Sequence, residues 1–360
     1  MKKMLQNMTC KKNLYTYLLV TAGFIVMQLL SSFGVLGSAV KGYLVPVCAY
    51  IVLAVSLNLL VGVCGELSLG HAGFMGIGAF CGIIVATILQ PAVPSDVLRL
   101  VAAMVAGGIL AGIFGVIIGI PALRLRGDYL AIVTLACGEI LKNVYSNLYV
   151  GTDAEGLHMA FSVDGFTLEE GGRMILDGPV GATGIDKIAT FPAGFVLILF
   201  TLFIVLNLIN SKEGRAIKAV RDNRIAAESV GINVTAFRMK AFVVSAFLAG
   251  MAGALFGLNF SSLTATKFNF NTSINILVFV VLGGMGNIMG SVISATVLYI
   301  LPEAMRGLDD LRMILYAVVL IVVMLCTWSP KLKQSLEALR ANLKEKLGKL
   351  LRKKEVASNE

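Results

Sequence analysis

Charged residues are scarce in this chain. Of its 360 residues only 14% are Asp, Glu, Lys or Arg, whereas 57% are hydrophobic. Soluble domains carry about 25% charged and about 45–50% apolar residues. The composition therefore predicts a protein that crosses a lipid membrane several times. The formal net charge of +9 lies in short segments between and beside the apolar ones, as in cytoplasmic loops, so it does not indicate nucleic-acid binding.

Motifs for catalysis and cofactor binding are also absent from the sequence. Gly348-Lys349 is followed by Leu350, and no G-x-x-x-x-G-K-[ST] segment exists to bind ATP. The two histidines lie far apart, and the six cysteines form no C-x-x-C pair, which argues against a metal site or a disulfide framework. We expect no enzyme activity, no cofactor and no metal, so any ATP that drives transport must be hydrolysed by another chain.

Long apolar segments predict the transmembrane helices. They cover residues 14–36, 43–63, 75–89, 97–120, 129–149, 191–209, 241–260 and 313–327. The interval 272–301 holds two shorter apolar segments around a glycine-rich stretch, and these form either two short crossings or one broken helix. Counting two gives an all-α polytopic membrane protein of about ten helices. An even number places both termini on one side, and the basic residues near each end indicate the cytoplasm.

The longer polar segments carry opposite charges. Segment 150–190 holds seven acids and two basic residues, which predicts an external loop forming a small, partly ordered cap. The transmembrane domain is expected to end near residue 330. The remaining tail, 331–360, has nine basic residues, four acids and leucines at helical spacing. That pattern predicts an amphipathic helix on the inner lipid surface.

Segment 211–240 lies between two apolar segments and carries seven basic residues against three acids. Read as one helix, it places five residues near one face: Ala216, Val220, Asn223, Ala227 and Val230. This pattern is typical of an amphipathic helix at the membrane surface that receives force from a partner. A solvated basic loop that only fixes the topology is an equally good interpretation of the residues alone.

Few polar residues fall within the apolar segments. Glu139 lies eleven residues after Asp128, about 16 Å along a helix, and Lys142 is placed to pair with it. Such a group is a functional candidate, although a structural ion pair buried between helices is the somewhat better explanation because Lys142 is so well placed. A second set lies near the turn after residue 63, where it forms either a structural turn or a substrate contact: Asn58, Glu66, Ser68 and His71.

Four stretches together resemble the LivM-type permease of branched-chain amino-acid ABC importers. They are SLNLLVG at 56–62 running into GELSLGHAGF at 65–74, LRGDYLAIVTL at 125–135, the segment from 214 to 253, and VLGGMG at 281–286. Their order and spacing cover nearly the whole chain. The resemblance implies a type II-like ABC importer permease in the bacterial cytoplasmic membrane.

The resemblance also implies partners for this chain. These are a second homologous permease, two cytoplasmic ABC ATPases and an extracytoplasmic amino-acid-binding protein. Segment 211–240 then resembles the coupling helix that docks on the ATPase. The residues assigned to it are Gly214, Arg215, Lys218, Arg221, Ala226, Ala227, Glu228 and Gly231. One departure is Ile225, which stands where the general importer motif has Glu.

The substrate implied by the resemblance is a branched-chain amino acid (Leu, Ile or Val), moved by alternating access. Related permeases that carry urea, short amides or other amino acids share these motifs and remain alternatives. A secondary transporter that works without an ATPase is a further alternative. The candidate translocation path comprises Asn58, Glu66, Ser68, His71 and Glu139.

Overall fold

The computed structural model describes residues 2–33, 37–125, 127–153, 156–162 and 172–304, together with 314, 317, 318 and 321. The chain divides into two units, Met1–Ile300 and Leu301–Glu360, and the first unit contains the helix bundle and a small sheet. The predicted last span, 313–327, lies largely outside the described residues, and the predicted amphipathic tail lies wholly outside them.

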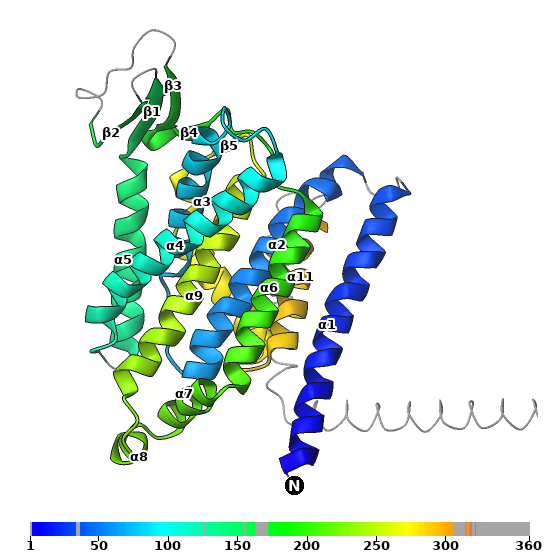
Figure 1. The fold of residues 1–360 in the computed structure, drawn as a ribbon, viewed down its shortest axis with the longest axis vertical. Coiled ribbons are helices and arrows are strands. Elements are labelled where there is room, and N and C mark those ends of the chain that lie inside the picture. Colours follow the sequence, from blue (N-terminus) through cyan, green and yellow to red (C-terminus); the bar gives the residue numbers. More distant parts are fainter. Residues whose placement is uncertain are drawn as a thin grey trace, which may run out of the picture. The chain divides into compact units, whose positions relative to one another are not determined.

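Six helices in the described part are long and apolar enough to cross a membrane. They are α1 (Lys2–Ser32, apolar from Leu14), α2 (Ser38–Asn58) with its continuation η1 (Leu59–Cys64), α3 (His71–Ile88), α4 (Asp96–Ala122), α6 (Phe191–Asn210) and α9 (Val234–Gly257) (Figure 1). The helix α5 (Asp128–Ser146) is less apolar because it carries Glu139 and Lys142. The total of about ten helices stays a prediction.

Helices α3, α4 and α9 pack closely through glycines. A Cβ atom added to Gly78 would lie 2.0 Å from the carbonyl oxygen of Gly250, and one added to Gly253 would lie 1.9 Å from that of Met75. Contacts this short exist only because these positions have no side chain. Close backbone approach through small residues is typical of helix packing in membranes.

The interval 272–301 forms two antiparallel helices, α10 (Phe270–Gly283) and α11 (Ile288–Ala304). The turn between them contains Gly284 and Gly286 with φ of +89° and +82°, a conformation that favours glycine. Ser294 of α11 donates a hydrogen bond to the carbonyl oxygen of Phe279 at 2.5 Å. This part of the chain therefore forms two separate helices, and the prediction that each is a short crossing stays a prediction.

The prediction of an all-α protein is wrong in the segment 150–190. It contains four strands, β1 (Tyr149–Asp153), β2 (Gly156–Ala160), β3 (Arg173–Asp177) and β4 (Gly181–Thr183), and the turn η3 (Gly178–Val180). A fifth strand, β5 (Ser262–Leu263), follows α9. The order is β2-β1-β3-β4-β5, with every pair antiparallel. Short strands with glycines at their ends escape a reading based on hydropathy.

The single helix expected in segment 211–240 is also wrong. The structure has α7 (Lys212–Asp222) and α8 (Arg224–Ser229), and α9 begins at Val234. Asn223 separates α7 from α8 because its backbone is extended (φ −154°, ψ 105°) and its side chain accepts a hydrogen bond from the amide of Ala226. Asn233 caps α9 in the same way. Asparagine is a strong N-cap residue, so it starts new helices here.

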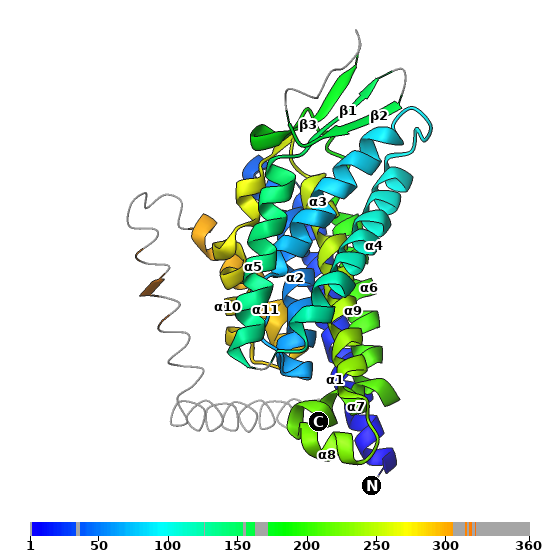
Figure 2. The same ribbon diagram turned by 90° about the vertical axis from the view of Figure 1, so that its left-hand side faces the viewer.

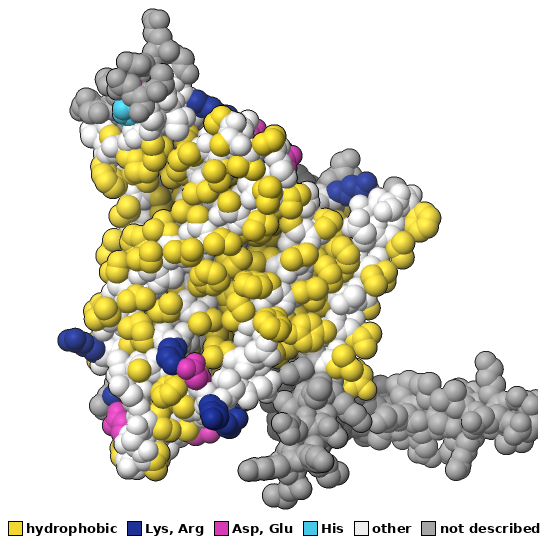
Figure 3. Space-filling view, viewed as in Figure 1, with side chains coloured by type: hydrophobic (Ala, Val, Ile, Leu, Met, Phe, Trp, Pro, Cys, Tyr) yellow, Lys and Arg dark blue, Asp and Glu magenta, His cyan; other side chains and the backbone are white. Residues whose placement is uncertain are grey.

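The two ends of the helix bundle differ. The sheet lies at one end and α7 and α8 lie at the other (Figure 2). On the face seen in Figure 3, hydrophobic side chains cover the middle, and Lys, Arg, Asp and Glu side chains gather toward the two ends. This distribution suits a bundle whose middle lies in hydrocarbon.

Candidate functional site

Helix α7 is fixed tightly to the end of α6. The side chain of Ser211 accepts a hydrogen bond from the amide of Gly214 at 3.1 Å. A Cβ atom at Gly214 would lie 2.1 Å from the carbonyl oxygen of Leu208, so the turn requires glycine. Of the basic residues on α7, Arg215 is exposed and Lys218 is partly buried. Burial lowers the pKa of Lys218, Arg221 lowers it further and Asp222 opposes both.

Helix α8 presents an apolar tip. Ala227 is buried with Val220 and Val234 in a small core that holds α7, α8 and α9 together. Ile225 and Val230 point away from this core, with exposed fractions of 80% and 73%. Val230 therefore does not share a buried face with Val220, as the single-helix interpretation required. The sequence held one sign of this exposed apolar tip, which is that Ile225 stands where the importer motif has an acidic residue.

The remaining predicted residues of this loop have several environments. Ala226 is exposed, and Glu228 pairs with Arg224 at 3.0 Å on the surface of α8. Gly231 ends α8 with φ +82°. Arg221 is different, because its guanidinium donates to the carbonyl oxygen of Gly62 at 2.9 Å and so reaches back to η1.

The structure does not gather the predicted path residues into one cavity. Asn58 is fully buried and contacts the turn before α11. His71 is buried at the start of α3, where its Nε2 lies 2.8 Å from the hydroxyl of Ser56. The hydroxyl of Ser68 is buried without a hydrogen-bond partner among the described residues. In the part of the chain that the structure describes, these three residues are enclosed by packing and hydrogen bonds rather than by an open path.

Glu66 forms an ion pair across the bundle. Its carboxylate lies 2.5 Å from the guanidinium of Arg238. Arg238 is buried and also donates to the carbonyl oxygen of Leu123 at 3.0 Å. Arg238 is one of the seven basic residues of segment 211–240, and α9, which begins at Val234, carries it into the bundle. The pair ties the turn after η1 to α9 and to the end of α4.

Glu139 forms the predicted ion pair with Lys142. Its second carboxylate oxygen accepts a hydrogen bond at 3.0 Å from the amide of Phe270, the first residue of α10. An anion at this position complements the positive end of the helix dipole. The pair therefore joins α5 to the start of α10, just after the turn η4 (Ala265–Phe268).

The exposed surface near this pair mixes polar and apolar side chains. The ion pair is partly exposed, and Asn143, Asn271 and Asn275 are exposed beside it on α5 and α10. Helix α4 differs, because the residues exposed along its middle are apolar: Val101, Val105, Ile109, Ile113, Val116 and Ile117. Polar side chains at membrane depth face protein or water rather than lipid.

The sequence is similar to that of known proteins. Residues 39–325 match the family model described as "Branched-chain amino acid transport system / permease component". The chain belongs to this permease family. It is a multi-pass membrane protein with the composition and helices of a transport subunit.

Individual relatives are also permease proteins of branched-chain amino acid transport systems. The permease is 31% identical over 292 residues to the high-affinity branched-chain amino acid transport system permease protein LivM of Salmonella typhimurium, covering 78% of this chain and 67% of the relative. The LivM protein of Escherichia coli K12 gives the same values. The LivH permease protein of Salmonella typhimurium is 24% identical over 69% of this chain and 79% of its own length.

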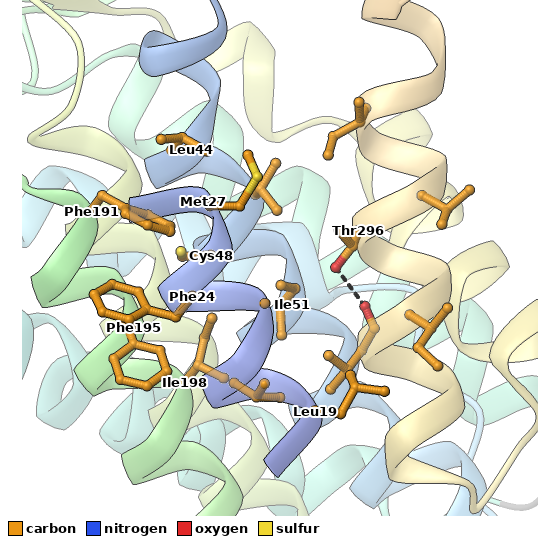
Figure 4. A pocket seen from close by; sticks show the side chains of 17 residues that line it. Leu19, Phe24, Met27, Leu44, Cys48, Ile51, Phe191, Phe195, Ile198 and Thr296 are labelled. Atoms are coloured by element: carbon orange, nitrogen blue, oxygen red, sulfur yellow. Dashed lines mark hydrogen bonds between the residues drawn. The ribbon is translucent and has the colours of Figure 1, made fainter. Parts of the chain in front are cut away.

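The permease also has a pocket of about 260 Å³ between α1, α2, α6 and α11. Figure 4 shows apolar side chains around it, among them Phe24 and Phe195, whose rings stack with centroids 4.0 Å apart. The hydroxyl of Thr296 donates to the carbonyl oxygen of Val292 and is therefore already satisfied. None of the described residues that line the pocket is charged, so it does not suit a zwitterionic substrate.

Proposed function

We propose that this permease is the membrane-spanning subunit of an ATP-driven importer for branched-chain amino acids. It works with a second, homologous permease, two cytoplasmic ABC ATPases and an extracytoplasmic amino-acid-binding protein. The observation that carries the proposal is the α7–α8 loop, which projects an exposed apolar tip, Ile225 and Val230, from a chain without a P-loop. Such a tip fits a groove on an ATPase that supplies the energy.

In this proposal the α7–α8 end of the bundle faces the cytoplasm of a bacterial cell, and both termini lie on that side. The sheet end faces outward, where the binding protein delivers substrate. ATP-driven closure of the ATPases moves the loop, and the helices alternate between outward and inward access.

The polar face of α5 and α10, which consists of Glu139, Lys142, Asn143, Asn271 and Asn275, supports the proposed substrate class. Glu139 and Lys142 offer one charge of each sign, as the ammonium and carboxylate of an amino acid require. Ile140 and Val144 are exposed on the same helix, with exposed fractions of 60% and 44%, and give apolar surface for a branched side chain. We place this face toward the second permease, where it lines part of the translocation path.

The test is transport by the complete complex in proteoliposomes. Uptake of labelled leucine should require ATP, both permeases and the binding protein, and should be competed by isoleucine and valine but not by urea or short amides. Competition by urea alone would assign the chain to the alternative substrate class. Uptake by this chain alone, without ATPases, would show a secondary transporter instead.

Docking is tested on the apolar tip. Ile225→Asp together with Val230→Asp should abolish co-purification of the ATPases, because two charges would be buried in an apolar groove. Leu157→Asp is the matched control, since Leu157 is an exposed apolar residue of β2 at the opposite end of the bundle. Charge reversal by Arg215→Glu with Arg221→Glu should also reduce assembly and uptake. Intact assembly in both loop variants would contradict this docking surface.

A further inference from the structure

Gly62 lies where three distant segments meet. It belongs to η1, the π-helical turn that continues α2. A Cβ atom added to it would lie 2.1 Å from the backbone nitrogen of Gly286, in the turn between α10 and α11. Its carbonyl oxygen accepts the hydrogen bond from Arg221 of α7 at 2.9 Å. The loop assigned to coupling and the α10–α11 turn therefore contact the same residue from two sides.

The side chain of Arg221 caps the C-terminal end of the helix formed by α2 and η1, whose C-cap residue is Gly65. The last carbonyl groups of a helix lack partners within it, and a cation there also complements the negative end of the dipole. Gly65, with φ +79°, ends η1, and a Cβ atom there would lie 2.5 Å from Cγ of Arg221. The arginine thus packs directly over a glycine that leaves room for it.

Asn58 forms the second connection. It lies one turn before Gly62 and is fully buried. Its Oδ1 accepts a hydrogen bond from the amide of Gly286 at 2.7 Å, and its Nδ2 donates to the hydroxyl of Ser291 at 2.7 Å. Both ends of one side-chain amide therefore hold the α10–α11 turn and the first turn of α11. Polar contacts of this kind are strong and directional in a dry interior.

We infer that Arg221 and Asn58 are positioning residues that link movement of α7 to the α10–α11 turn through η1. The inference rests on the proposed coupling function of the α7–α8 loop. When the ATPases displace α7, Arg221 moves the Gly62 carbonyl. Gly62 and Asn58 carry the displacement to Gly286 and Ser291. The π-helical turn is the deformable part of this connection, because such turns hold the backbone in a less regular conformation than an α-helix.

The experiment uses the full importer complex in proteoliposomes and measures ATP hydrolysis and leucine uptake in the same sample. Arg221→Met removes the hydrogen bond to Gly62 and also the exposed ion pair with Asp222 at 2.8 Å. The exposed pair contributes little, so the uptake per ATP hydrolysed should fall by about tenfold, as expected when the hydrogen bond to Gly62 is lost. Asn58→Leu should lower it similarly. Arg221→Lys keeps a charged donor and should restore most of the ratio.

The matched control is Arg224→Met, because Arg224 lies on α8 and pairs there with Glu228 rather than with η1. It should leave the ratio unchanged. If Asn58→Leu does not assemble, Ser291→Ala is measured instead, because it removes the acceptor of the Asn58 amide group together with only a long hydrogen bond to the carbonyl oxygen of Asn287 at 3.4 Å. An unchanged ratio in Arg221→Met, or an equal fall in Arg224→Met, overturns the inference.

A distance measurement separates a link from a merely structural role. Spin labels at Ala219 on α7 and Met285 in the turn occupy exposed positions. In the protein that keeps Arg221, the distance between the two spin labels should be the same with and without ATP. In Arg221→Met, this distance should change when ATP binds. The same separation in both proteins would also overturn the inference. Failure of ATP-dependent uptake in the unsubstituted complex would instead refute the proposed function, before any variant is compared.

Discussion

Two ion pairs within the helix bundle differ in how much of them is exposed. Arg238 and Glu66 join different segments, and their side chains are 4% and 16% exposed. Lys142 and Glu139 lie three residues apart on α5, and their side chains are 24% and 35% exposed. The first pair is enclosed by α9, by the turn after η1 and by the end of α4. The second opens onto the polar face of α5 and α10.

Under the proposed function, the difference corresponds to two uses of charge in one membrane protein. An enclosed pair fixes architecture, because removing either partner leaves the other buried without compensation. An open pair keeps its charges available to another molecule while each partner reduces the cost of the other. A third pair, Lys240–Glu213 at 2.5 Å, is about half exposed on both sides and extends the comparison to the surface.

The largest effect is expected from Arg238→Met. It leaves the carboxylate of Glu66 and the carbonyl oxygen of Leu123 without their partner, and should cost about 3 kcal/mol or more of stability. Thermal unfolding of the purified permease in detergent, together with its yield from membranes, measures this effect. The double variant Arg238→Met with Glu66→Gln should recover part of the loss. If the Arg238→Met protein were as stable as the unsubstituted protein and lost only transport, the enclosed pair would have a functional role and not a structural one.

An intermediate effect, on transport rather than folding, is expected from Glu139→Gln. The amide oxygen of glutamine still accepts the hydrogen bond from Phe270, so the variant removes the charge and keeps the contact. Leucine uptake below saturation should fall by about tenfold, the loss expected for one charged contact with substrate, while the melting temperature changes little. Glu213→Gln is the control, because its ion pair lies away from this face. Unchanged uptake in Glu139→Gln would show that transport does not require the charge of Glu139.

The smallest effect is expected from Lys240→Ala. Exposed ion pairs contribute about 0–1 kcal/mol, so the variant should unfold within a few tenths of a kcal/mol of the unsubstituted protein and transport at a similar rate. Arg238 lies two residues away on the same helix. The difference in the free energy of unfolding between Lys240→Ala and Arg238→Met therefore measures the contribution of burial. A large loss of stability in Lys240→Ala would show that exposure does not rank these pairs.

Hydropathy located the helices better than it located their ends. The segments predicted from residues 75 and 241 begin instead at His71 and Val234, because His71 and Arg238, polar residues in their first two turns, are buried. His71 contacts Ser56, and Arg238 contacts Glu66. Partners brought together only by folding satisfy these side chains, and local sequence patterns do not include them. The break at Asn223 was readable in principle, since asparagine commonly starts helices.

The candidate site was predictable where its contacts are local. The pair of Glu139 and Lys142 follows from a spacing of three residues on a helix. The contact between Asn58 and Gly286 joins residues 228 apart, and a single sequence holds no signal for such a pairing. The exposed tip at Ile225 and Val230 also depended on the fold, because their direction is set by how α8 packs on Val220 and Val234.

The short strand β5 fixes the distance between two connections of the chain. Through the pairing of Ala182 with Leu263, the connection after α9 is hydrogen-bonded to the connection that leads into α6. A pair of probes on β4 and β5 should therefore keep a constant separation throughout a transport cycle. A probe on either strand can then serve as the same reference point. Distances from it to a moving helix, measured in separate experiments, can be compared directly.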